Sequence, residues 1–149
     1  EINNKELLLS LKSAIASTAN IELVRERHKH AKEAPIIIDD SFENTAKTKD
    51  IASMLEKIGL EQEIERCKKK KVRAGRGKMR GRKYRKKKGL LFVLSDSSAL
   101  KAARNIAGAD VVLIEDLLKN KNTELFAPGT EAGRLTVFSK SSLEKMKDL

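Results

Sequence analysis

Apolar residues in the first third of the chain recur at three- and four-residue spacing, which predicts amphipathic helices. The first helix is expected over residues 4–19, with its buried stripe formed by Leu7, Leu8, Leu11, Ile15 and Ala19. A second, short helix is expected over residues 21–30, with Asn20 as its N-cap. A third is expected over residues 45–58, and Gly59 would end it as a C-cap.

Four short apolar runs, several rich in β-branched residues, predict buried strands. They are residues 35–39, 90–94, 111–114 and 134–138. Helical spacing returns between and after them. One helix would follow caps at residues 95–97 and use Leu100, Ala103 and Ile106, a helical turn would contain Leu117 and Leu118, and a capping box at residues 141–144 would open the last helix.

Strands that alternate with helices predict an α/β fold with a mainly parallel four-stranded sheet and helices on both faces. The length of 149 residues suits one domain, so residues 1–149 are interpreted as a single α/β domain. The longest apolar runs fall well short of the ~20 residues that span a bilayer. Leu7–Leu9 is soon interrupted by Ser10 and Lys12, unlike a signal peptide, so no membrane partner is expected.

Positive charge is concentrated in residues 68–88, which we name the basic segment. Fourteen of these 21 residues are Lys or Arg and none is acidic, whereas the other 128 residues carry 18 basic and 21 acidic groups, a net charge of −3. The excess charge of the chain (+11) is therefore local. The segment is expected to be an extended surface loop inserted in the domain, partly disordered without its partner.

So many neighbouring cations repel one another, and a phosphate backbone would supply the opposite charge. Gly75, Gly77, Gly81 and Gly89 would let the backbone approach such a partner closely. Tyr84 is the single aromatic residue of the segment, which favours folded RNA over serial stacking on single strands. A nuclear-import signal or a solvated tail would need fewer cations, and the glycine spacing matches neither GxGxxG nor a P-loop.

Acidic residues after three predicted strands suggest an alternative function. Asp39–Asp40, Asp96 and Glu115–Asp116 could bind Mg²⁺ in a nuclease or another phosphoryl-transfer enzyme, although acids at these places commonly cap helices. His28 and His30 are placed on the surface of a polar helix end, and Cys67 is interpreted as a small, partly buried apolar residue. No metal or cofactor is expected. A protein-interaction adaptor ranks lower, because no apolar stripe is left over once the core is assigned.

Several strings in one order carry a resemblance to a known family. They are LKSAIASTA (residues 11–19), LVRERH (23–28), IIIDD (36–40) with KTK (47–49), RAGRGKMRGRKYR (73–85), AARN (102–105) and APGxxxGRL (127–135). With them the chain resembles the fourth protein of the large ribosomal subunit in its archaeal and eukaryotic form. The string at residues 73–85 is the most specific of them.

The resemblance implies a Rossmann-like core without catalytic residues, cofactor or small-molecule substrate. It implies a cytoplasmic, ribosomal location, with large-subunit ribosomal RNA and neighbouring ribosomal proteins as partners and a role in subunit assembly and stability. The RNA-binding residues would be Arg73, Arg76, Lys78, Arg80, Arg82, Lys83, Tyr84, Arg85, Lys86 and Lys87, with Arg25, Arg27 and His28 as weaker candidates. Family members also have an amino-terminal region and a loop that reaches the exit tunnel. Neither is expected in this chain, which is interpreted as a fragment, so tunnel roles are not carried over.

Overall fold

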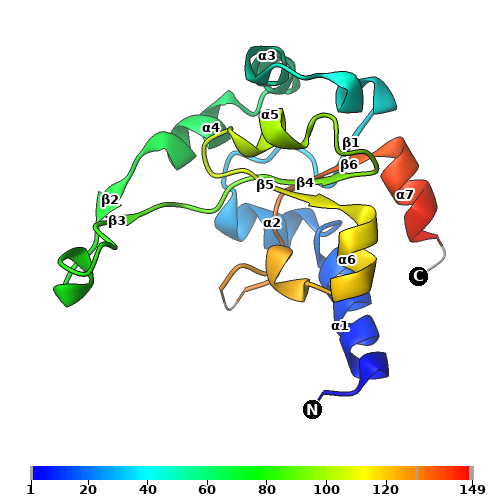
Figure 1. Ribbon diagram of the computed structural model, residues 1–149, viewed down its shortest axis with the longest axis horizontal. Helices are drawn as coiled ribbons and strands as arrows, with labels where there is room; N and C mark the ends of the chain where they lie inside the picture. The colour runs from blue at the N-terminus through cyan, green and yellow to red at the C-terminus, as the bar shows by residue number, and fades with distance from the viewer. Residues whose placement is uncertain (1, 130, 148–149) are drawn as a thin grey trace.

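A parallel sheet of four strands forms the centre of the computed structural model, which describes residues 2–129 and 131–147 (Figure 1). The order across the sheet is β1 (Ile36–Ile38), β6 (Thr136–Ser139), β4 (Leu91–Leu94) and β5 (Asp110–Leu113), and each neighbouring pair is parallel. All four residues of β4 are buried, because this inner strand is covered on both faces. The predicted α/β class with a parallel four-stranded sheet is confirmed.

Helices cover both faces of the sheet. They are α1 (Asn4–Ser17), α2 (Ile21–Arg27), α3 (Thr48–Ile58), α4 (Glu61–Lys68), α5 (Leu100–Arg104), α6 (Ile114–Asn120) and α7 (Lys140–Met146). One core cluster joins Phe92 and Val137 of the sheet to residues of α3 and α5. The other joins Leu91 and Phe138 to residues of α1, α6 and α7. Successive strand residues thus face opposite helical layers.

Two predicted helix signals are confirmed and two are wrong. The Asn20 side chain accepts a hydrogen bond from the Glu22 backbone N–H, and Gly59 ends α3 with a left-handed φ of 86°. The predicted capping box at residues 141–144 lies inside α7, because Ser139 at the end of β6 is the N-cap. Helix α5 has Ala99 as its N-cap, without a side-chain bond. The caps predicted at residues 95–97 form a turn before it, in which the Asp96 carboxylate accepts from Ser97 and Ser98.

Helix α4 was not expected from the sequence. Its buried positions, Glu63 and Cys67, are an acid and a thiol, so the apolar spacing that predicts a helix is missing. Helix α2, in turn, is shorter than predicted and ends at Arg27. His28 leaves the helical conformation (φ −112°, ψ 71°) and turns its ring into the interior.

No single helix among the described residues is long and apolar enough to cross a membrane. Only α1 and α2 taken together reach the required length and composition, and an 84° bend separates them.

Candidate nucleic-acid interface

The basic segment forms a hairpin, whereas an extended and partly disordered surface loop was expected. It leaves the end of α4, forms the antiparallel strands β2 (Lys71–Val72) and β3 (Tyr84–Arg85), and returns through residues 86–88 to β4. The Arg73 N–H donates to the Lys83 carbonyl at 2.8 Å and continues the ladder beyond the strands. In Figure 1 the hairpin projects away from the sheet and its helices.

Glycines shape the tip of this hairpin. Gly75 and Gly81 have φ values of 75° and 76°, a region that side chains other than glycine rarely adopt. Between them lies a short 3-10 turn, Arg76–Lys78, and the Arg82 N–H donates to the Gly77 carbonyl at 3.1 Å. A Cβ on Gly75 or Gly81 would meet nothing within 4 Å. These two glycines therefore serve the turn itself and not packing.

The predicted RNA-binding residues of the hairpin are brought together in one exposed element. All ten, from Arg73 to Lys87, are exposed. None of their charged side chains forms an ion pair or a hydrogen bond with another residue that the structure describes. The Tyr84 ring lies near two ammonium groups, at 5.9 Å from Lys70 Nζ and 5.6 Å from Lys83 Nζ. The cations are left free to bind an external anion.

A buried polar cluster fixes the root of the hairpin to the domain. Glu63 of α4 is 2% exposed, and its carboxylate accepts from Arg66 at 2.6 and 2.8 Å and lies 2.5 Å from His28 Nδ1. Burial raises the pKa of Glu63, but the hydrogen bonds with His28 and Arg66 outweigh it and hold the pKa below its usual value. Arg66 also donates to the Lys88 carbonyl at 2.9 Å. The cluster thus joins α2 and α4 to the returning strand of the hairpin.

Arg134 holds the other side of the root. It is fully buried, and its guanidinium donates to the backbone carbonyls of Gly89 (2.7 Å), Leu90 (3.0 Å) and Leu125 (3.0 Å). It also pairs with Asp110 at 2.8 Å, and Lys88 pairs with the same carboxylate at 2.7 Å. Burial raises the pKa of Asp110, yet Lys88 and Arg134 lower it further than burial raises it.

A close contact between α4 and the sheet depends on two glycines, Gly89 and Gly108. The Gly89 N–H donates to the Gly108 carbonyl at 2.9 Å, and both residues lie against Cys67. A Cβ on Gly89 would stand 2.6 Å from Cys67 Sγ, and one on Gly108 would stand 2.8 Å from it. Gly89 therefore serves internal packing and not the expected approach to phosphate. Cys67 is buried, as expected, and burial raises the pKa of its thiol. It is packed as a small apolar residue.

The weaker candidates differ in exposure, since Arg25 is exposed, Arg27 is partly exposed and His28 is buried. His28 is 0% exposed, so its predicted surface position is wrong: Glu63 draws the ring inward, and RNA could not reach it without opening the core. Arg25 donates to the Ala31 and Lys32 carbonyls. Arg27 donates to the carbonyls of Pro128 and Glu131. These three residues lie outside the hairpin. Arg25 and Arg27 bond to loop carbonyls, and His28 bonds to α4.

Arg27 nevertheless lines a basic cleft at the hairpin root. The cleft has a volume of about 420 Å³, and its lining consists of eight basic residues and Pro128. Lys69 lines it from the end of α4, Lys71 from β2 and Arg85 from β3. No acid lines this cleft, so positive charge continues from the hairpin onto the domain.

Four of the five acids proposed for Mg²⁺ binding have other partners. Asp40 accepts from the N–H and hydroxyl of Ser141 at the start of α7, and these bonds lower its pKa. Asp39 pairs with Lys140 and Glu115 lies 3.8 Å from Lys145. Within residues 2–129 and 131–147, no group of three His, Cys, Asp or Glu residues is arranged to hold a metal ion. Of these acids, only Asp40 thus bonds to a helix start among the described residues, so the capping interpretation holds for this acid alone.

The expectation that no apolar surface is left over is wrong. Ile37, Met54 and Ile58 are 55%, 37% and 41% exposed and, with Phe42, line a groove of about 580 Å³ beside β1. The sheet order places β1 at an edge, so its outer side has no neighbouring strand among the described residues.

Sequence reasoning missed the residues that orient the hairpin: Glu63, Arg66, Asp110 and Arg134. The spacing of Glu63 and Arg66, three residues apart, is typical of an ion pair on a helix and could have indicated α4. No comparable signal marks Arg134, because its partners are backbone carbonyls distant in the sequence.

Comparisons with known proteins agree with this geometry. A family model described as the ribosomal protein L4/L1 family matches residues 1–149. Large ribosomal subunit protein uL4 from Archaeoglobus fulgidus is 49% identical over 147 residues, which are 97% of this chain and 57% of that protein. The proteins of the same name from Methanocaldococcus jannaschii and Haloarcula marismortui are 46% and 42% identical over 99% of this chain.

The chain spans 57–59% of the length of these relatives. The matches nevertheless cover nearly all of the sequence, from the first helix to the last, and include the basic hairpin. On these grounds the chain belongs to the ribosomal protein L4/L1 family.

Proposed function

We propose that this chain is a non-catalytic structural constituent of the large ribosomal subunit, located in the cytoplasm, that binds ribosomal RNA through the basic hairpin. The observation that carries the proposal is the exposed hairpin itself, whose cations, apart from Lys88 at its root, have no acidic partner among the described residues. Binding of RNA to such an element is favourable, because phosphates supply the missing negative charge and the counterions bound to the RNA are released. Single-domain organisation, contacts with neighbouring ribosomal proteins and a role in subunit assembly belong to the same proposal.

The anchored root supports this function physically. A flexible basic tail would lose conformational entropy on binding, whereas a hairpin held by Arg66 and Arg134 is already ordered. The relatives are named as proteins of the large ribosomal subunit, and an RNA partner is consistent with that name. No observation favours the phosphoryl-transfer alternative.

Salt dependence tests the electrostatic mechanism. The affinity for large-subunit ribosomal RNA is expected to fall with salt on a log–log plot, with a slope near −0.7 to −0.9 for each contacted phosphate. Filter binding or fluorescence anisotropy at increasing KCl concentrations measures this slope. A slope near zero contradicts the proposal.

The combined substitution Arg76→Gln, Arg80→Gln and Arg82→Gln tests the site. It is expected to weaken RNA binding and to make the salt slope shallower, while the melting midpoint stays the same, because these side chains contact no part of the core. The matched control is Lys12→Gln, Lys49→Gln and Lys119→Gln, three exposed positions on α1, α3 and α6 with the same loss of charge. Equal weakening by both triple variants would mean that net charge, and not the hairpin, binds the RNA.

A further inference from the structure

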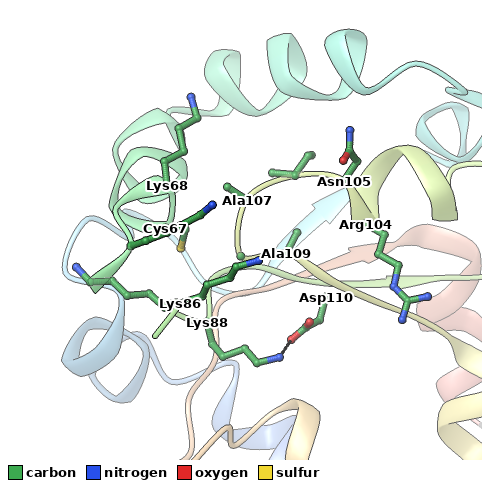
Figure 2. A pocket seen from close by; sticks show the side chains of 13 residues that line it. Cys67, Lys68, Lys86, Lys88, Arg104, Asn105, Ala107, Ala109 and Asp110 are labelled. Carbon is green, nitrogen blue, oxygen red and sulfur yellow. Dashed lines mark hydrogen bonds and ion pairs between the residues drawn. The ribbon is translucent and has the colours of Figure 1, made fainter. Parts of the chain in front are cut away.

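A second feature of the hairpin root is a pocket on the side of α5. It has a volume of about 560 Å³ and lies between the end of α4, the returning residues 86–88 and the loop of residues 105–109 (Figure 2). This volume is within the ~300–1,000 Å³ of pockets that receive small organic groups. It is large enough for one nucleotide.

The rim of the pocket is positively charged. Six basic residues line it: Lys68, Lys70, Lys86, Lys87, Lys88 and Arg104. Asp110 is the one acid in the lining, and its carboxylate already pairs with Lys88 and Arg134. The net field in the pocket therefore favours a phosphate.

The floor has a different character. Cys67, Ile106 and Ala109 are buried there beside the half-buried Ala107, and together they give a small apolar surface. Figure 2 shows Arg104 and Asn105 opposite the side chains that come from α4 and residues 86–88. The Asn105 amide is exposed and makes no hydrogen bond with another described side chain or backbone group, so it can both donate to and accept from a base edge.

The position of the pocket indicates where each part of a nucleotide would lie. Five of the six basic residues come from residues 68–70 and 86–88, and loop 105–109, which follows α5, supplies none. The Ala103, Ile106 and Gly108 carbonyls already accept backbone N–H groups, so the exposed Asn105 amide would be the group that binds the base edge. The base would therefore lie on loop 105–109 and the phosphate on the lysines.

Free nucleotides and cofactors of open α/β folds bind at the carboxyl ends of the strands. This pocket lies at the opposite edge, because Gly89 precedes β4 and loop 105–109 precedes β5. It adjoins the hairpin instead, and Lys86, Lys87 and Lys88 line both this pocket and the basic cleft on α2's side. An RNA strand on the hairpin is thus the nearest source of a nucleotide.

We propose that this pocket receives one unpaired nucleotide of the bound RNA, splayed out of its stack. The inference rests on the proposed RNA-binding function and adds a site that recognises a base to a hairpin that recognises phosphates. Proteins read RNA sequence mainly at such unstacked nucleotides in loops and bulges. The cost of unstacking, a few kcal/mol, is least for a nucleotide that is already unpaired.

The test is to fill the pocket without changing its charge. Ala107→Leu places a larger side chain on the floor, and Ala46→Leu, on an exposed loop before α3, is the matched control. Wild-type and variant proteins are bound to large-subunit ribosomal RNA, whose base edges are probed chemically nucleotide by nucleotide. Wild type and Ala46→Leu should protect one unpaired nucleotide that Ala107→Leu leaves reactive. The affinity of Ala107→Leu should be about tenfold weaker with an unchanged salt slope, because contacts with a base and not with phosphates are lost.

A second variant guards against a local folding defect. Asn105→Ala removes only an exposed amide, and it should abolish protection of the same nucleotide. If both variants bind RNA with wild-type affinity and give the wild-type reactivity pattern, the pocket does not receive a nucleotide. The proposed RNA-binding function of the hairpin would still stand. If the wild-type protein itself shows no salt-dependent binding to the RNA, the proposed function is overturned instead.

Free nucleotides provide the remaining arm. The four nucleoside monophosphates are titrated into the protein, and the backbone amides of residues 105–109 are followed by NMR. Two results together would overturn the RNA assignment and show a site for free nucleotides. They are strong chemical-shift changes of these amides, and no nucleotide in the RNA whose protection is lost in Ala107→Leu.

Discussion

Arg134 is a buried guanidinium that bonds to three backbone carbonyls and to Asp110. Arg134→Ala would leave these acceptors without partners in the interior, where each unmet hydrogen bond costs about 1–3 kcal/mol. Asp110 would keep Lys88 as its partner, so the loss should come mainly from the three carbonyls, and we expect the unfolding free energy to fall by about 3–5 kcal/mol. Urea unfolding measures it.

Arg104→Ala provides the reference for this measurement, because Arg104 is exposed and forms no ion pair with another described residue. Its effect should stay within about 0.5 kcal/mol, as for most surface changes. Equal stability of both variants would show that the buried bonds of Arg134 contribute nothing net.

Glu63 makes the stability of the domain depend on acid. Its pKa is lowered in the folded protein from an ordinary value of 4.5. The contribution of Glu63 to the unfolding free energy is therefore complete above pH 4.5 and is lost as the pH falls through the folded pKa. Glu63→Gln cannot titrate, and its unfolding free energy should fall less steeply with acid than that of wild type. Thermal melts from neutral pH to below 4.5 measure the difference.

Glu61→Gln on the same helix is the control for this pH profile, since Glu61 is exposed and has no ion pair among the described side chains. It should follow wild type. Coincident profiles for Glu63→Gln and wild type would mean that the His28 and Arg66 contacts do not stabilise the charged carboxylate.

At the scale of elements, the approach of α4 to β4 is limited by the space between Cys67 and Gly89. Gly89→Ala would place a methyl group 2.6 Å from Cys67 Sγ, and overpacking of this kind costs about 1–3 kcal/mol. Cys67→Ala removes the sulfur. The double variant should therefore be more stable than the sum of the two single effects predicts, and a double-mutant cycle of chemical denaturation measures this coupling. Additive effects would show that the helix shifts instead.

The elements differ in how far the sequence could predict them. Strands such as β4 and β5 are continuous apolar runs, because parallel strands are buried on both faces, and their positions were predicted within one residue or so. Helix α4 carries an acid at a buried position, which only its partners His28 and Arg66 explain. The hairpin was missed because charge repulsion within the segment predicts disorder, whereas anchoring at Gly89 and Lys88 comes from distant parts of the chain.

The molecule as a whole consists of a nearly neutral domain and a strongly basic projection. This division, and the choice of hairpin residues as the candidate RNA interface, could be read from local composition. The burial of individual side chains could not be predicted from local composition. His28 looks like a surface residue in a string of charged neighbours, and its burial depends on a carboxylate 35 positions away.

If the tip only serves RNA, it can be removed without harm to the domain. The variant replaces residues 74–82 by Asn-Gly, which favours a tight two-residue turn. The new turn joins Arg73 and Lys83, whose backbones already share a hydrogen bond of 2.8 Å. The replacement removes four of the fourteen cations. The melting midpoint should not change, since these residues pack on none of the core clusters. RNA affinity should fall, and the salt slope should become shallower by about 0.7–0.9 for each lost phosphate contact. A lower melting midpoint would show that the tip supports the fold, and unchanged RNA binding would move the interface to the basic cleft at the root.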